Sequence, residues 1–176
     1  MTDQSRVESN IRAISFGERF QASQQFDQVF KEGMALVERT AAYLDGTGRK
    51  DSKGLPSHLT VLYATESMRL TTRLLDLASW LLIRRALKEG EITEAEAATK
   101  RTKVKLQSLG RPSHIKGFDE LPRGLRDLIV ESFSLHDRIV QLDRAFSVNA
   151  DEADPNAFNP VGAQVIALQR AFSRAS

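Results

Sequence analysis

Apolar side chains recur at helical spacing over three long stretches of the chain. The first stretch begins near Ser15, which has the spacing of a capping box with Glu18, and it stops at Gly46. At about 100° per residue, its apolar positions share one helix face. They are Phe16, Phe20, Phe26, Phe30, Met34, Val37, Ala41 and Leu44. The pattern predicts a long amphipathic helix that begins the folded domain.

The second stretch runs from Ser57, which can cap a helix, to Glu89, and Gly90 marks its end. Before it, residues 45–56 carry glycines and a closing proline, which predicts a loop. One face of this second helix is expected to lie in the core. Its residues are Leu59, Leu62, Tyr63, Leu70, Leu74, Leu77, Trp80 and Leu81.

Two further helices follow. Thr93 and Glu96 form a second capping box and begin a short charged helix that runs to about Leu109. Pro122 suits the first turn of a third long helix, which ends near Ser147. One face of that helix carries Leu121, Leu125, Leu128, Ile129, Leu135, Ile139, Leu142 and Phe146. No stretch alternates apolar and polar residues as a strand does.

These elements predict an all-α protein. Three long helices joined by modest loops favour an antiparallel bundle with one short extra helix. The bundle domain is expected over residues 15–147, after a flexible N-terminus over residues 1–14. Acidic, proline- and asparagine-rich sequence follows, so residues 148–176 are expected to form a flexible tail. In that tail the short segment 161–172 is amphipathic, with one face formed by Val161, Val165, Leu168 and Phe172.

The second long helix is apolar on two opposite sides. Its second stripe has spacings of three, four or seven residues and comprises Val61, Ala64, Met68, Leu75, Leu82 and Ala86. The first helix offers a thinner stripe at heptad spacing, formed by Val29, Leu36 and Tyr43. Because a helix in a three-helix bundle keeps one outward side, this second apolar side needs another cover.

Two covers fit this stripe. The first is a second copy of the chain, packed helix against helix in an isologous homodimer. The alternative is that the short helix, residues 93–109, folds back over the stripe. That helix offers few apolar side chains, chiefly Val104, Leu106 and Leu109. The homodimer is therefore the favoured prediction.

Composition excludes several classes of protein. The 176 residues include no cysteine, which removes disulfides and thiolate chemistry and fits a reducing cytoplasm. The apolar run that starts at Leu74 is broken by Asp76 and closed by Arg84, so it cannot span a bilayer. The start of the chain, MTDQSRVESNIRAISFG, lacks the apolar run of a secretory signal. A net charge of +2 permits nucleic acid as a partner without arguing for it.

No residues have a spacing that predicts an enzyme. His58, His114 and His136 form no pair with metal-binding spacing, and His136 is expected to be a partly buried side chain with a hydrogen bond. The loop sequence GTGRKDSKG lacks the phosphate-loop pattern and joins helix to helix. The sequence therefore predicts a non-enzymatic protein with no catalytic residues, no cofactor and no metal.

Charged side chains also line one flank of the second long helix. They are Glu66, Arg69, Arg73 and Asp76. Their spacing predicts ion pairs along a solvated flank, each contributing tenths of a kcal/mol, on the order of 0.3. An active-site role is therefore not favoured.

A basic cluster flanks the predicted turn at Gly90. It comprises Arg84, Arg85, Lys88, Lys100, Arg101, Lys103 and Lys105. That outline is similar to a helix-turn-helix, so a helical DNA-binding regulator is one alternative function. However, Glu91, Glu94 and Glu96 open the helix that would enter the groove, and carboxylates there repel phosphates.

Two runs of the sequence resemble a known family. They are RTAAYLDGTGRKDSKGLP and LTVLYATESMRLTTRLLDLASWLLIRRALKEGEIT, in which the part from Met68 to Leu82 is the most specific. Both resemble the regulator-of-CtrA-degradation (RcdA) family of alphaproteobacteria, which has also been catalogued as a domain of unknown function. The resemblance covers roughly residues 20–147, and the tail matches only in kind.

The resemblance implies a small dimeric helical bundle that works as an adaptor for the ATP-dependent protease ClpXP in cell-cycle control. Such an adaptor docks on protease primed by a small response-regulator protein and delivers cargo. The implied cargo includes transcription factors and a cyclic-di-GMP effector. The tail segment 161–172 is expected either to dock on partners or to pack on its own bundle. A dimeric scaffold outside proteolysis is the remaining alternative.

Overall fold

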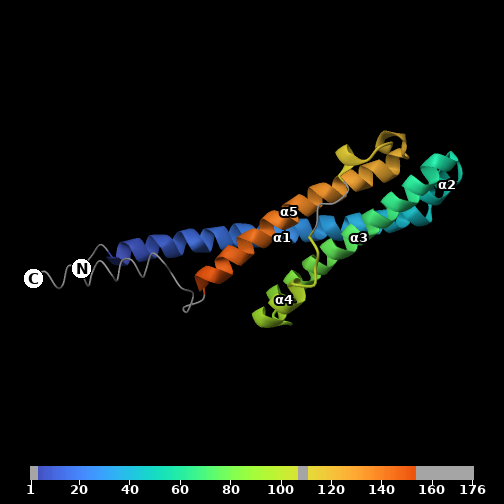
Figure 1. The fold of residues 1–176 in the computed structure, drawn as a ribbon. Coiled ribbons are helices and arrows are strands. Elements are labelled where there is room, and N and C mark those ends of the chain that lie inside the picture. The colour runs from blue at the N-terminus through green and yellow to red at the C-terminus, as the bar shows by residue number, and fades with distance from the viewer. Residues whose placement is uncertain (1–3, 107–110, 154–176) are drawn as a thin grey trace, which may run out of the picture. The chain divides into compact units, whose positions relative to one another are not determined.

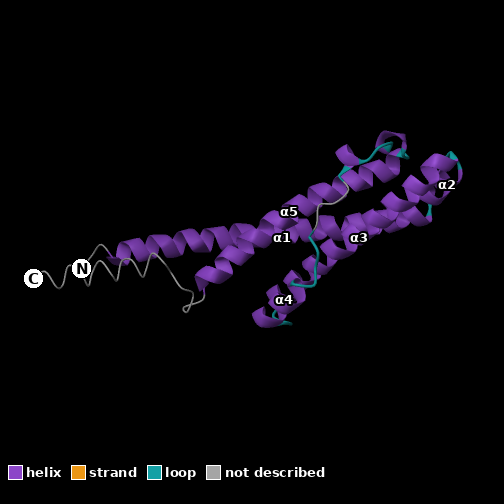
Figure 2. Ribbon diagram, viewed as in Figure 1, coloured by secondary structure: helices purple, strands orange, loops and turns teal. Residues whose placement is uncertain are grey.

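The computed structural model describes residues 4–106 and 111–153, and within these ranges all regular secondary structure is helical (Figures 1 and 2). The side chains described are those of residues 23–106 and 111–147. The elements, in chain order, are α1 (Gln4–Asp45), α2 (Thr47–Lys53), α3 (Ser57–Lys88), α4 (Glu94–Arg101), the 3₁₀ turns η1 (Pro112–His114) and η2 (Phe118–Glu120), and α5 (Arg123–Ala153). The predicted all-helical fold is confirmed.

The chain divides into two compact units at Leu142 and Asp143, and the packing given below is that of the first unit. The predicted limits of the bundle domain, residues 15–147, and of the flexible tail, residues 148–176, stay predictions. The amphipathic segment 161–172 lies outside the described residues.

Helix α1 begins at Gln4, so the predicted helix start at Ser15 is wrong. Residues 4–15 contain neither glycine nor proline, and a capping sequence does not end a helix that can continue upstream. The predicted end is confirmed. Helix α1 stops at Asp45, and the Gly46 N–H donates to the Ala42 carbonyl at 3.0 Å.

The buried face of α1 is rotated from the predicted one. The face comprises Phe26, Val29, Gly33, Leu36 and Thr40, whereas Phe30, Met34 and Val37 are half-buried and Ala41 is exposed. A glycine explains the rotation, because a Cβ at Gly33 would lie 2.6 Å from Leu81 Cδ1 and 3.4 Å from Leu135 Cδ2. Helix α1 therefore packs most closely where it has no side chain, and the apolar pattern alone does not reveal this.

Helix α2 occupies part of the predicted loop 45–56, so that prediction is wrong. The reason is tertiary contact. The Tyr63 hydroxyl donates to the Gly48 carbonyl at 2.8 Å, and the Tyr43 hydroxyl donates to Asp51 Oδ2 at 3.0 Å. Burial raises the pKa of both phenols, and for Tyr43 the Asp51 hydrogen bond adds to the increase. These bonds hold a glycine-containing turn in helical form despite its weak propensity.

Helix α3 begins at Ser57, and Pro56 occupies its N-cap without a side-chain bond, so the predicted Ser57 cap is wrong. Its end is as predicted, since α3 stops at Lys88 and Gly90 has a φ of +74°. The core face of α3 is confirmed except for Leu62, which is half-buried. Leu70, Leu77, Trp80 and Leu81 are among the least exposed side chains of the described chain.

The capping box of α4 is confirmed. Thr93 Oγ1 accepts from the Glu96 N–H at 3.2 Å, and Glu96 Oε2 accepts from the Thr93 N–H at 2.8 Å. Helix α4 ends at Arg101, short of the predicted Leu109, although Val104 beyond it is still buried. Pro122 lies directly before α5 rather than in its first turn, and its carbonyl accepts from Arg126 N–H at 3.1 Å.

Candidate interaction face

The outward side of α3 exposes four large apolar side chains at intervals of seven residues. Their exposed fractions are 71% for Val61, 72% for Met68, 64% for Leu75 and 51% for Leu82. Ala64 is exposed and Ala86 is half-buried. The sequence predicted that these residues form part of a partner face. In the single chain, the large apolar residues of α3 among them are exposed to solvent.

The α1 part of the predicted partner face is wrong. Val29 and Leu36 are buried inside the bundle, at 4% and 3% exposure. Tyr43 is half-buried and bonded to Asp51. These three residues contact the rest of the same chain because α1 turns its Gly33 side, and not its Met34 side, toward the core.

Small residues alternate with the large ones along this side of α3. Thr65, Thr72, Ser79 and Ala86 each follow a large residue by four positions, which gives steps of four and three throughout. We call the eight residues the outer face: Val61, Thr65, Met68, Thr72, Leu75, Ser79, Leu82 and Ala86. Steps of four and three are the spacing of a helix–helix seam.

Two hydroxyls on the outer face are satisfied within α3 itself. Thr65 Oγ1 donates to the Val61 carbonyl at 2.8 Å, and Ser79 Oγ donates to the Leu75 carbonyl at 2.7 Å. A hydroxyl with an internal acceptor loses less when water is removed than one that depends on solvent. These two hydroxyls can therefore be covered by another helix at little polar cost.

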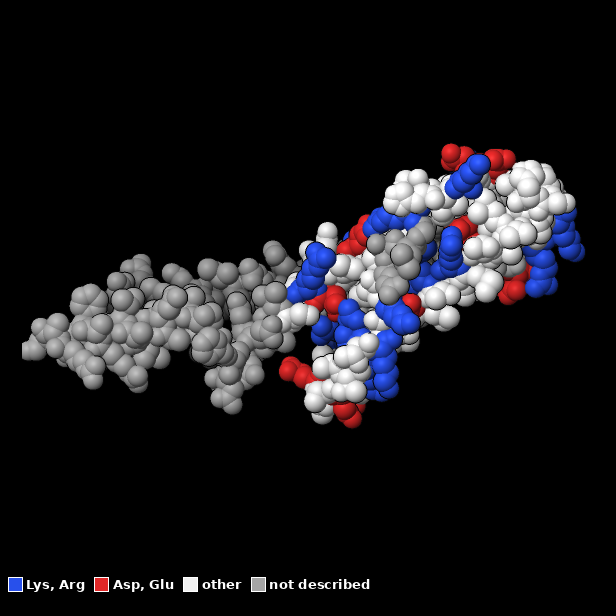
Figure 3. Space-filling model, viewed as in Figure 1, with Lys and Arg blue, Asp and Glu red and all other residues white. Residues whose placement is uncertain are grey.

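Charge is scarce around the outer face. Between positions 61 and 82, all of which are described, Arg69 is the single charged residue in the exposed class, and its Nη1 donates to Glu66 Oε1 at 2.7 Å. Lys and Arg side chains gather instead over α2 and around α4, with acidic side chains beside them (Figure 3). The outer face is thus an uncharged strip on a charged chain.

Helix α4 does not cover this strip. With α4 and residues up to 106 in place, Leu75 and Leu82 keep more than half of their surface exposed. The apolar side chains that this segment buries are Ala97 and Val104. The alternative in which the short helix closes the stripe is therefore wrong for the described residues.

On the opposite side of α3, polar side chains that were predicted to lie in solvent form a buried network. Arg73 Nη1 donates to Ser132 Oγ of α5 at 2.7 Å, and the guanidinium lies 3.6 Å from the Phe133 ring centroid. Burial lowers the pKa of Arg73 to about 10. Glu66 is 1% exposed, so it too lies inside the bundle. The prediction of a solvated flank is wrong for Glu66 and Arg73.

His136 of α5 has the predicted hydrogen-bond contact, although at 4% exposure it is buried more fully than predicted. Its Nδ1 lies 3.2 Å from Asp137 Oδ1, and the same carboxylate accepts from Arg111 Nη2 at 2.6 Å. The Arg111 bond holds the pKa of Asp137 below its usual value. Among the described residues no group of His, Cys, Asp and Glu has the arrangement of a metal site. Arg111 also lies 5.1 Å from the Phe133 ring centroid, so these contacts join α3 and the connector to α5.

Comparison with known proteins identifies the family. The model of a family described as protein of unknown function (DUF1465) matches residues 17–172. The crystal structure of RcdA from Caulobacter crescentus CB15 is 50% identical in sequence, with a TM-score of 0.55. The match covers 68% of this chain and 88% of that one. This chain belongs to the RcdA family. No curated protein matches it.

The membership confirms the family resemblance seen in the sequence. The run from Met68 to Leu82, where that resemblance is most specific, also carries most of the outer face. The signal for the outer face was therefore present in the sequence. The sequence indicates the burial of Arg73 less clearly. Arg73 is three residues after Leu70 and four before Leu77, so it has the spacing of the core face.

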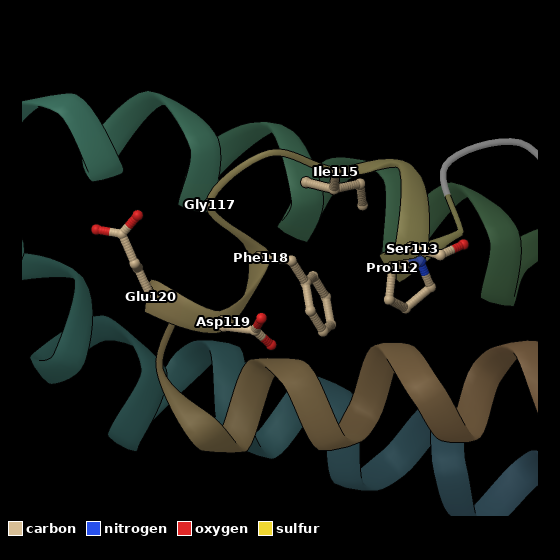
Figure 4. A pocket seen from close by; sticks show the side chains of 7 residues that line it. All are labelled: Pro112, Ser113, Ile115, Gly117, Phe118, Asp119 and Glu120. Atoms are coloured by element: carbon tan, nitrogen blue, oxygen red, sulfur yellow. The ribbon is translucent and has the colours of Figure 1, made fainter.

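One pocket of this RcdA-family chain lies on the connector between α4 and α5 (Figure 4). Its volume is about 490 Å³, and it is lined by Pro112, Ser113, Ile115, Gly117, Phe118, Asp119 and Glu120. Phe118 points toward α5, whereas the Glu120 carboxylate points away from that ring. The predicted histidine nearest in sequence, His114, is exposed. Nothing in this lining pairs a nucleophile with a base.

Two residues of the basic cluster near Gly90, Arg85 and Lys88, are paired with carboxylates of the same chain. Arg85 Nε donates to Glu89 at 2.8 Å, Lys88 Nζ donates to Asp27 at 2.6 Å, and the Arg84 guanidinium lies 5.8 Å from the Trp80 ring centroid. In the described ranges, every helix is too short or too polar to cross a membrane.

Proposed function

We propose that this protein is a non-enzymatic adaptor that delivers cell-cycle regulatory proteins to the ClpXP protease. The observation that carries the proposal is the 50% identity with RcdA over most of the folded chain, because that family resemblance implies adaptor work. The outer face of α3 supports it. An exposed, uncharged helix face of this length is typical of a surface that binds another protein.

The proposed partners are three. The first is a second copy of the chain, bound through the outer face. The second is ClpXP that a response-regulator protein has primed. The third is cargo, namely transcription factors and a cyclic-di-GMP effector. We propose the cytoplasm as the location, because ClpXP acts there, and neither a membrane nor nucleic acid is among the proposed partners.

The proposed mechanism is tethering. One surface holds the primed protease while another holds cargo, so cargo meets the protease at an effective concentration on the order of millimolar. We assign part of the docking to Val161, Val165, Leu168 and Phe172, whose spacing suits a helix that lies in a groove. Catalysis stays with the protease.

A reconstituted degradation assay tests the proposal. Purified ClpXP, its primer protein, candidate cargo and ATP are combined with and without this protein. We expect cargo to disappear faster with the protein while the protein itself persists. The matched control leaves out the primer, and the acceleration should then be lost. If no cargo is degraded faster under any priming condition, the adaptor proposal is wrong.

A truncation tests the part assigned to the tail. A chain that ends after Ala153 keeps all of α5 but lacks the segment 161–172. We expect circular dichroism to show that the helices of the truncated chain stay folded. We also expect delivery of at least one cargo to be lost. Full delivery of every cargo by the truncated chain would place docking elsewhere.

A further inference from the structure

Positive charge accumulates without acidic neighbours where α4 ends. From Ala97 to Phe118 the sequence contains six Lys and Arg residues and neither Asp nor Glu. Four of these cations are exposed and form no ion pair within the described residues, and three of the four lie close together in sequence. We call these three the basic turn: Lys100, Lys103 and Lys105.

Many other cations on the surface of the described chain have a carboxylate partner. Lys88 pairs with Asp27, and Arg138 pairs with Glu32, so in both cases α1 supplies the carboxylate. The ammonium groups of the basic turn have no such neighbour and repel one another. Carboxylates from another molecule would relieve that repulsion, so the basic turn favours an anionic partner.

Hydrogen bonds hold the backbone of the basic turn in place. The Lys103 N–H donates to the Lys100 carbonyl at 3.2 Å, and the Val104 N–H donates to the Arg101 carbonyl at 3.1 Å. Arg101 Nη1 in turn donates to the Val104 carbonyl at 3.0 Å. Val104 is 8% exposed and anchors the segment, while Lys103 and Lys105 on either side of it are exposed. A backbone that is already ordered loses less entropy when a partner binds.

The surroundings of the basic turn favour an acidic protein segment over a nucleic acid. Glu94 and Glu96 lie in the first turn of the same eight-residue helix, which is about 12 Å long, and they would repel a phosphate backbone that continues past the lysines. Between Ala97 and Phe118 the one Phe, Tyr or Trp side chain is Phe118, which is 9% exposed and cannot stack on bases. Lysines attract carboxylates as point charges, without a fixed bonding geometry.

We propose that the basic turn, formed by Lys100, Lys103 and Lys105, binds an acidic segment of a partner protein, with a carboxylate of the partner near each ammonium group. The inference goes beyond the adaptor proposal, because it concerns a second surface and does not depend on ClpXP. The outer face of α3 contains no charged residue, so the two surfaces select partners of different chemistry. Binding through the basic turn should weaken as salt rises.

A synthetic acidic peptide tests the proposal. The probe is a fluorescein-labelled peptide in which glutamate alternates with serine, and its neutral counterpart carries glutamine in place of glutamate. We expect fluorescence anisotropy to show binding of the acidic peptide that weakens steeply with salt, and no binding of the neutral one. A labelled oligothymidine of equal length is the nucleic-acid probe. No binding of the acidic peptide at low salt, or tighter binding of the oligothymidine, would overturn the proposal.

Two variants of equal charge locate the binding surface. The first replaces the three lysines of the basic turn: Lys100→Gln, Lys103→Gln and Lys105→Gln. It should weaken binding of the acidic peptide about tenfold, because three surface ion pairs are lost. The control carries Lys31→Gln, Lys50→Gln and Lys53→Gln, which are also exposed positions, and should bind nearly as well as the parent chain. Equal weakening in both variants would show attraction to the whole chain and would overturn the proposal.

Cross-linking maps the contact on the unaltered chain, so it decides the question even if the triple variant unfolds. A carbodiimide joins lysine ammonium groups directly to carboxylates of the bound peptide, and mass spectrometry identifies the modified lysines. We expect the peptide on the lysines of the basic turn. A peptide attached mainly to Lys50, Lys53 or Lys116 would place the contact elsewhere and contradict the proposal.

Discussion

Arg73 of α3 and Ser132 of α5 form a buried hydrogen bond of 2.7 Å, and Ser132 passes the interaction on by donating to the Ile129 carbonyl at 2.7 Å. Phe133 closes one side of the guanidinium. Helices α3 and α5 are thus joined inside the core by a cation that is 8% exposed. A buried cation of this kind stabilises the fold only while its acceptors stay in place.

Removing one partner of this bond should cost more than replacing the cation. We expect Ser132→Ala to lower the free energy of unfolding by about 1–3 kcal/mol, because a buried donor loses its acceptor. Arg73→Met should cost less, since it removes the charge together with its need for partners. Urea unfolding followed by circular dichroism measures both. A larger loss for Arg73→Met than for Ser132→Ala would show that the guanidinium contributes through other contacts.

Close packing at Gly33 predicts a second stability effect. Gly33→Leu should destabilise the bundle by about 1–3 kcal/mol, because the new side chain overlaps with Leu81 and Leu135. Ala35→Leu is the matched control, at an exposed position two residues along the same helix. It should change the free energy of unfolding by less than about 0.5 kcal/mol. Thermal and urea unfolding of the two variants give the comparison, and equal effects would contradict the assigned packing.

The tyrosines beside α2 predict loss of stability in alkali. Burial raises the pKa of Tyr43 and of Tyr63 above the unfolded value of about 10. The folded state therefore favours the neutral phenols, and this contribution is complete below pH of about 10 and lost as pH rises through the folded pKa values. Urea midpoints measured from neutral pH to strong alkali should fall in that upper range.

A single substitution provides the control for this titration. Tyr43→Phe keeps the ring but cannot ionise, so its unfolding midpoint should depend less on alkaline pH than that of the parent chain. It should also lose some stability at neutral pH, because the hydrogen bond to Asp51 is gone. An unchanged alkaline slope would assign the effect to other groups.

Charges placed on the outer face should separate folding from association. Met68→Glu with Leu75→Arg replaces two side chains that a single chain leaves mostly exposed. We expect the helical content to persist and the dimer to fall to a monomer, because both changes fall on the proposed contact. Light scattering gives the mass and circular dichroism the fold. A dimer mass equal to that of the parent would contradict the proposed surface.

Periodicity alone located the long helices and the core face of α3, because those residues obey one rule, the burial of an apolar arc. It failed where one tertiary contact outweighed local sequence. Because α1 packs closely at Gly33, Val29 and Leu36 lie in the core. The hydrogen bond from Tyr63 to Gly48 stabilises part of the predicted loop as helix α2. Periodicity also placed Arg73 in solvent, since the acceptor Ser132 lies 59 positions away in sequence. Such contacts depend on the assembled bundle.

The turn at Gly90 combines a restricted backbone with open surroundings. Its φ of +74° requires glycine or a residue that tolerates the left-handed region, yet no atom beyond the two adjacent residues lies within 4 Å of where a Cβ would be. The backbone is demanding there while the surrounding space is empty. A label attached at this exposed turn would therefore begin in open space, away from both the core and the outer face.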